Sequence, residues 1–115
     1  MIQLRSDTPI QVAIKPADFR KGIDGFAAIC RQQLASEPHS GTLFVFINRN
    51  RTMIRALQYD GTGFWLMTKR LSKGCFHDWP QSSEPMEMMQ AKSLRSLLSF
   101  DDVVKTSDKI TNSVV

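Results

Sequence analysis

The chain has 115 residues and lacks the features that define several common classes of protein. Its two cysteines, Cys30 and Cys75, are too few for a disulfide scaffold. Neither cysteine has further ligands at a zinc-like spacing, so we expect no metal and no cofactor. No apolar run approaches the roughly 18 residues that span a bilayer, and no signal peptide opens the chain. We therefore expect a cytoplasmic protein with no membrane partner.

Recognisable catalytic motifs are missing as well. A metal-dependent DNA-cutting enzyme needs clustered carboxylates that hold two metal ions roughly 3.5–4 Å apart. Asp18 is expected to cap a helix and Asp60 to lie in a turn. These structural roles explain both acids, so neither needs a catalytic role. Asp24 follows Asp18 by six positions and would lie on another side of that helix. We predict that the protein is not an enzyme and has no small-molecule substrate.

Acidic residues are scarce in the first part of the chain. Residues 1–81 hold eleven lysines and arginines against six acids, whereas residues 82–115 hold four against five, and the whole chain carries a net charge of +4. A basic body is compatible with binding a polyanion such as DNA. It is equally compatible with a role in solubility alone.

Hydrophobic periodicity predicts a single small α+β domain over residues 1–100, followed by a loosely attached tail over 101–115. Apolar residues spaced by three and four predict one main helix over about 19–35, and a short C-terminal helix over about 90–99. Alternating or continuous apolar segments separated by polar turns predict an antiparallel sheet of three to five strands with the helix on one face. The expected strands are 11–15 and the three strands of a central meander, 43–47, 52–59 and 63–69.

Several short motifs occur in a specific order. The first is Asp18-x-Arg20-Lys21-Gly22-x-Asp24-Gly25. Between His39 and Leu71 follow Ser-Gly, Phe-Val-Phe, Asn-Arg-x-Arg, Tyr-Asp-Gly and Lys-Arg-Leu. Over residues 9–100 this order resembles the small TnpB accessory proteins, encoded by the second open reading frame of bacterial insertion-sequence family sixty-six. The resemblance implies a non-catalytic role in DNA transposition, beside the element's transposase and a second accessory protein.

The polar turn at residues 48–51 is the main candidate for contact with DNA at the element ends. Arginine suits bidentate contact with phosphate or guanine, asparagine suits adenine edges, and a two-stranded ribbon fits the major groove. Lys21 is a cation in the first turn of the expected helix, where it opposes the helix dipole. A solvated turn without a partner remains the alternative. The candidate set is Lys21, Asn48, Arg49, Asn50, Arg51, Arg55, Lys69, Arg70 and Lys73.

A second hypothesis needs no affinity for DNA. The protein would then be an interaction subunit of the transposition complex, docking through an exposed apolar edge near Phe76 and Trp79. The aromatic residues of the strands, such as Phe44 and Phe46, are better explained by core packing than by stacking on RNA bases.

Overall fold

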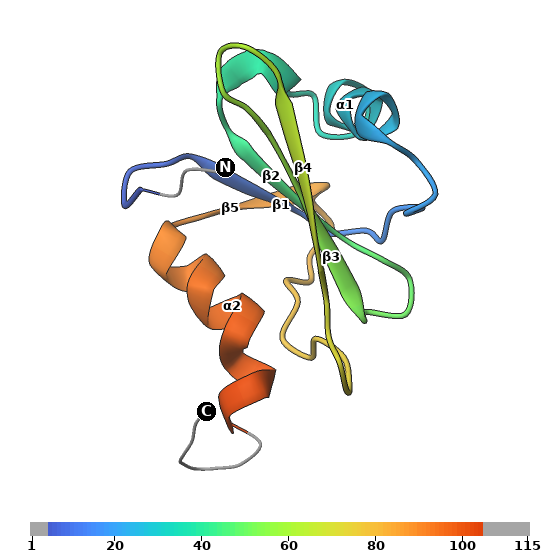
Figure 1. The fold of residues 1–115 in the computed structure, drawn as a ribbon, viewed down its shortest axis with the longest axis vertical. Helices are drawn as coiled ribbons and strands as arrows, with labels where there is room; N and C mark the ends of the chain where they lie inside the picture. The colour runs from blue at the N-terminus through green and yellow to red at the C-terminus, as the bar shows by residue number, and fades with distance from the viewer. Residues whose placement is uncertain (1–4, 105–115) are drawn as a thin grey trace.

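A computed structural model describes residues 5–104 of the chain, and the side chains of residues 5–98. It contains one five-stranded sheet with the strand order β4-β3-β2-β1-β5, two α-helices and a short 3-10 helix (Figure 1). This arrangement confirms the α+β class. The strands are β1 (Ile10–Ala13), β2 (Leu43–Ile47), β3 (Met53–Tyr59), β4 (Phe64–Arg70) and β5 (Met86–Met89), and the helices are α1 (Ile23–Gln32), η1 (Pro38–Ser40) and α2 (Ala91–Val104).

The sheet is mixed rather than antiparallel throughout. Strands β2, β3 and β4 form the expected antiparallel meander, and β5 pairs antiparallel with β1. The expectation of a wholly antiparallel sheet is wrong at β1 and β2, which run parallel with Ile10 opposite Leu43. The chain leaves β1, crosses the sheet through α1 and returns in the same direction, and such a crossover connection joins parallel strands.

Helix α1 is shorter than the expected span of 19–35 at both ends. Before it, the Asp18 carboxylate accepts a hydrogen bond from the Arg20 amide at 3.0 Å, which makes a turn in place of a first helical turn. After it, Ala35 takes a left-handed conformation with φ of 51°, and the Ser36 amide donates to the Cys30 carbonyl at 2.9 Å. These features end the helix, with alanine in the left-handed conformation where glycine is usual.

The face of the sheet under α1 carries one part of the core. Phe26 and Cys30 of the helix are fully buried, and they share a cluster with Phe44, Phe46 and Leu57 of the sheet. The Phe26 and Phe46 ring centroids lie 4.9 Å apart. Core packing is therefore confirmed for Phe44 and Phe46, whereas Trp65 on β4 is 39% exposed.

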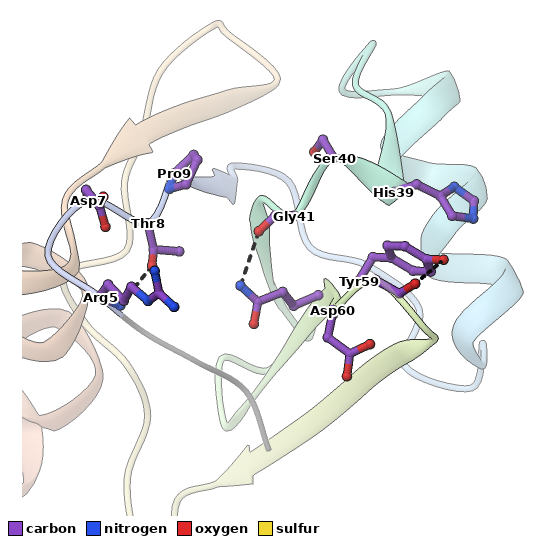
Figure 2. A pocket seen from close by; sticks show the side chains of 11 residues that line it. Arg5, Asp7, Thr8, Pro9, His39, Ser40, Gly41, Tyr59 and Asp60 are labelled. Carbon is purple, nitrogen blue, oxygen red and sulfur yellow. Dashed lines mark hydrogen bonds between the residues drawn. The ribbon is translucent and has the colours of Figure 1, made fainter.

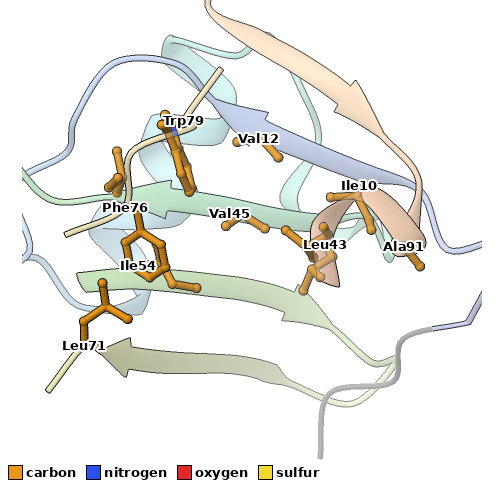
Figure 3. Packing of buried hydrophobic residues seen from close by; sticks show 11 residues of the cluster. Ile10, Val12, Leu43, Val45, Ile54, Leu71, Phe76, Trp79 and Ala91 are labelled. Atoms are coloured by element: carbon orange, nitrogen blue, oxygen red, sulfur yellow. The ribbon is translucent and has the colours of Figure 1, made fainter. Parts of the chain in front are cut away.

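The opposite face of the sheet is covered by the segment after β4 and by the first turns of α2 (Figure 3). Phe76 and Trp79 are only 1% and 2% exposed, and the Trp79 indole N–H donates to the Ala13 carbonyl at 2.9 Å. The expectation of an exposed apolar edge at these two rings is wrong. Since α1 covers one face of the sheet alone, the apolar side chains of Val12, Val45 and Ile54 on the other face need a separate cover, which this segment supplies.

The C-terminal part of the domain begins with a strand that the sequence left ambiguous. Residues Met86–Met89 form β5 beside β1, and α2 follows at once. This helix runs to Val104 and so extends past residue 99, where it was expected to end. The division of the chain at residue 100 stays a prediction, and residues 105–115 of the expected tail lie outside the described residues.

Candidate nucleic-acid interface

Three loops meet at the end of the sheet where β1, β2 and β4 finish and β3 begins (Figure 1). The Ala17 amide donates to the Ile47 carbonyl at 2.9 Å, which ties the loop after β1 to the end of β2. The Phe76 amide donates to the Arg51 carbonyl at 2.8 Å, which ties the segment after β4 to the turn between β2 and β3. Two motifs that are well separated in the sequence, Asp18–Gly25 and residues 48–51, are thereby placed side by side.

A groove of about 650 Å³ lies between that loop and that turn. We call it the loop–turn groove. Its polar lining residues are Asp18, Arg20, Asn48, Arg49, Asn50 and Arg55. Five of these six residues carry amide or guanidinium donors, so the groove offers mainly hydrogen-bond donors and positive charge.

Asn48 shapes the turn, and its side chain makes three hydrogen bonds within it. Its side-chain oxygen accepts hydrogen bonds from the Thr52 amide at 2.9 Å and the Met53 amide at 3.1 Å, and its side-chain nitrogen donates to the Thr52 hydroxyl. Arg51, rather than an asparagine, takes the left-handed conformation, with φ of 61°. These bonds hold the turn in one conformation and leave Arg49 and Asn50 exposed at its tip.

Arg55 is engaged inside the protein. One terminal nitrogen of its guanidinium donates to the carbonyls of Phe19 at 2.7 Å and Lys21 at 3.1 Å, and its Nε donates to the Thr68 hydroxyl at 2.9 Å. The guanidinium carbon also lies 5.1 Å from the centroid of the Phe19 ring and 5.8 Å from that of Phe26, within cation–π range. Arg55 therefore fastens the loop before α1 to the sheet, a role that the sequence did not reveal.

Arg20 is paired with Asp18. The spacing of four residues between Arg20 and Asp24 would favour a pair with Asp24 on a helix, but Arg20 lies before α1 begins. A terminal guanidinium nitrogen of Arg20 lies 2.8 Å from a carboxylate oxygen of Asp18. This hydrogen bond holds the pKa of the Asp18 carboxyl well below its ordinary value of 3.8. The pair contributes little net charge to the groove.

Lys21 is exposed, and its placement explains a glycine inside α1. A Cβ added at Gly25 would lie 2.7 Å from the Lys21 Cβ and 3.0 Å from its Cγ, closer than real carbon atoms approach. Glycine at this position lets the stem of Lys21 lie against the first turn of the helix. Glycine in the first turn of α1 lowers helix propensity, but it leaves room for the side chain of Lys21, an exposed cation directly before the helix cap.

The far end of β4 adds cations to the same end of the sheet. Arg70 pairs with Met53 in the ladder and is exposed beside the start of β3, and Lys73 is exposed in the segment that follows. Lys69 instead turns to α2, where its ammonium donates to the Leu98 carbonyl at 2.8 Å. Lys15, two residues after the end of strand β1, joins these cations although the sequence did not single it out. Its place follows from the parallel pairing of β1 and β2, which brings both strand ends to one edge and which the sequence did not predict. We call this cluster the basic end, and it consists of Lys15, Lys21, Arg49, Arg51, Arg70 and Lys73.

The other end of the sheet has a polar cleft of about 720 Å³ between the N-terminal segment, η1 and the β3–β4 turn (Figure 2). Its polar groups are largely occupied in holding turns. The Asp60 carboxylate accepts hydrogen bonds from the amides of Thr62 and Gly63 at 3.0 Å and from the Trp65 indole at 2.8 Å. These bonds, with the Thr62 amide first, lower the pKa of Asp60 to about 2. Asp60 is therefore a turn residue, as the sequence indicated.

Neither a cluster of three metal-ligating side chains nor a membrane-crossing helix occurs in the described part of the chain. Within residues 5–104, no three histidine, cysteine, aspartate or glutamate side chains are grouped so that they could hold a metal ion. In the same part of the chain, neither helix has the length and apolar character needed to cross a membrane.

Comparison with known proteins agrees with the resemblance carried by the motifs. A family model described as IS66 Orf2 like protein matches residues 8–107. The chain is 30% identical over 102 residues to the uncharacterized protein y4hO of Sinorhizobium fredii (strain NBRC 101917 / NGR234), covering 89% of this chain and 88% of that protein. It is 39% identical over 67 residues to the uncharacterized protein y4jC of the same strain, covering 58% of this chain and a little over half, 57%, of y4jC. No solved structure matches the chain. The chain therefore belongs to the IS66 Orf2 like family of transposition-associated accessory proteins.

Proposed function

We propose that this protein is a non-catalytic accessory factor that contacts the DNA of its own insertion sequence through the basic end, beside the transposase and the second accessory protein. The observation that carries the proposal is the union of two separate motifs around the loop–turn groove, with exposed cations on both sides. Arg49 lines the groove from the turn side, and Lys21 directly follows the loop residues that line its other side.

The residues at the basic end are expected to fill two roles: some contact DNA phosphates and position the protein, and others recognise bases. Exposed lysines and arginines neutralise phosphates, which supplies affinity without sequence information. Arg49 and Asn50, at the tip of a rigid turn, are the side chains able to reach base edges, because arginine and asparagine match guanine and adenine. Asn48 holds the turn in its conformation, and Arg55 fastens the loop before α1 to the sheet, so both stabilise this surface.

The test is fluorescence anisotropy with two duplexes, one carrying the terminal inverted repeat of the element and one scrambled. Both are titrated from about 50 to about 200 mM salt, the range in which phosphate contacts show themselves. We expect tighter binding to the repeat. In the double variant Lys21→Ala and Lys73→Ala, we expect the slope of log affinity against log salt to fall by roughly 2, about one unit for each lost phosphate contact.

A matched control removes the same charge elsewhere. Arg31 on α1 and Lys92 on α2 are exposed and lie outside the basic end, so the double variant Arg31→Ala and Lys92→Ala should keep the wild-type slope. Equal losses in the two variants would mean that only net charge matters. An unchanged slope in a folded Lys21→Ala and Lys73→Ala variant would remove the basic end from the DNA contact. Failure of the wild-type protein to bind either duplex would reject the proposal and favour a role confined to protein docking.

A further inference from the structure

The two edges of the sheet differ in length and in what they expose. β5 has four residues, includes the acid Glu87, and is short enough to resist pairing with another chain. β4 has seven residues, and its exposed face carries Trp65 and Met67, which are 39% and 48% exposed. A long edge strand with exposed apolar side chains is a ready partner for another strand.

The hydrogen-bond pattern shows which main-chain groups of β4 face outward. The Asp60 amide donates to the Gly63 carbonyl at 3.0 Å, and the Leu71 amide donates to the Thr52 carbonyl at 2.9 Å. Since antiparallel hydrogen-bonded pairs alternate along the ladder, the main-chain groups of Trp65, Met67 and Lys69 face β3. The amides and carbonyls of the alternate residues face away from the sheet, and among residues 5–104 they have no strand partner. These residues are Phe64, Leu66, Thr68 and Arg70.

The sequence of β4 is complementary to itself in the antiparallel direction. Its first half is aromatic and apolar, and its second half ends in Lys69 and Arg70. An antiparallel pair centred on Met67 uses all seven residues and joins the outward-facing main-chain groups of the two strands. It sets Trp65 opposite Lys69 of the second copy, and Phe64 opposite Arg70 of the second copy, where cations meet aromatic rings. A parallel in-register pair would instead place like charges against each other.

We propose that the protein forms a homodimer in which β4 pairs with β4 of a second copy about a twofold axis at Met67. The two five-stranded sheets then become one continuous sheet, with both α1 helices on the same face. Lys69 keeps its ammonium on the Leu98 carbonyl and offers its aliphatic stem to Trp65 of the second copy. The twofold axis directs the two basic ends in opposite directions, so Arg70, the last residue of β4, is the one member of the basic end that takes part in the contact.

Sedimentation equilibrium of the full chain tests the dimer without any DNA. We expect a mass twice that of the 13.1 kDa chain, falling towards that of the monomer on dilution. The Met67→Lys variant brings two like charges together at the axis and should weaken the dimer by about tenfold or more. The Met88→Lys variant makes the same change at a residue of β5 that is 57% exposed, and it should leave the dimer intact.

Two further variants examine the axis itself. An equimolar mixture of the Met67→Lys and Met67→Glu variants should dimerise again, because residue 67 faces its own counterpart and the charges are then opposite. In a Cys75→Ser background, Met67→Cys should form an intermolecular disulfide under mild oxidation. Residues at a non-hydrogen-bonded antiparallel position have Cα atoms about 4.5 Å apart, within the range that a disulfide spans.

The outcomes separate this proposal from the proposed DNA contact. A monomer at all concentrations, a dimer that survives Met67→Lys, or an absent cross-link would each overturn pairing through β4, whatever the anisotropy measurements show. A monomer whose β4 edge instead captures the transposase, with capture lost in Met67→Lys, would also overturn self-pairing and assign the edge to that partner. Circular dichroism of each variant confirms that it is folded.

Discussion

Replacement of Arg55 by alanine should destabilise the protein far more than replacement of any exposed arginine. Arg55 donates to two backbone carbonyls and one hydroxyl at 2.7–3.1 Å. Hydrogen bonds from a charged donor contribute about 1.5–3 kcal/mol each when buried, and we take about 1 kcal/mol each for this half-exposed group. Contact with the rings of Phe19 and Phe26 adds about 0.5–1 kcal/mol. Arg55→Ala should therefore lower the free energy of unfolding by about 3–4 kcal/mol.

Urea denaturation followed by far-ultraviolet circular dichroism measures this loss. With a slope of about 1–3 kcal/mol per molar urea, the midpoint should fall by at least about 1 M. Arg49→Ala, at an exposed position of the turn, should change the free energy of unfolding by less than about 0.5 kcal/mol. Arg55→Lys should recover only part of the loss, because an ammonium cannot reproduce the guanidinium fork. A loss below about 1 kcal/mol in Arg55→Ala would refute the argument that Arg55 fastens the loop to the sheet.

Two more predictions concern a buried indole and an exposed carboxylate. Trp79→Phe keeps an aromatic ring but leaves the buried Ala13 carbonyl without its donor, so thermal unfolding should show a loss of about 1–3 kcal/mol; no loss would show that the bond contributes nothing net. The folded pKa of Asp60, about 2, lies below the ordinary 3.8, so its contribution is present above pH 3.8 and is lost as the pH falls towards 2. The Asp60→Asn variant should accordingly lose less stability than the wild type between pH 5 and pH 2 in acid titrations of unfolding, and parallel titration curves would contradict this assignment.

Local patterns in the sequence predicted the elements but not their non-local partners. The meander from β2 to β4 was predicted because its strands are joined by short turns and carry the period of a sheet. The parallel pairing of β1 with β2 and the strand β5 escaped prediction, since both depend on pairing between segments that are far apart in the chain. Helix α1 started late because Asp18 bonded to the backbone of its own turn, which competes with helix formation.

The structural roles of some candidate site residues could not be predicted for a related reason. Asn48 and Arg55 belong to residue types suited to nucleic acids, yet their partners are backbone amides and carbonyls, which no residue pattern displays. Phe76 and Trp79 were expected at an exposed apolar edge, but the face of the sheet opposite α1 required a cover. The exposure of Arg49 and Lys73 was easier to predict, because side chains in a polar turn or loop usually lie in solvent.

The number of cations left over after these structural roles limits how tightly one chain can hold DNA. The fold itself uses Asn48, Arg55 and Lys69 of the nine residues that the sequence singled out. If about four of the remaining cations each meet one phosphate, log affinity should fall against log salt with a slope of about −3.6. Between about 50 and about 200 mM salt, that slope weakens binding by roughly a hundredfold. Such a contact is modest for a single chain, whereas a β4-paired dimer has two basic ends that point in opposite directions and can each hold one duplex. Where the two duplexes are the two ends of one element, binding of the first makes binding of the second intramolecular, and the dimer gains affinity that one basic end alone lacks.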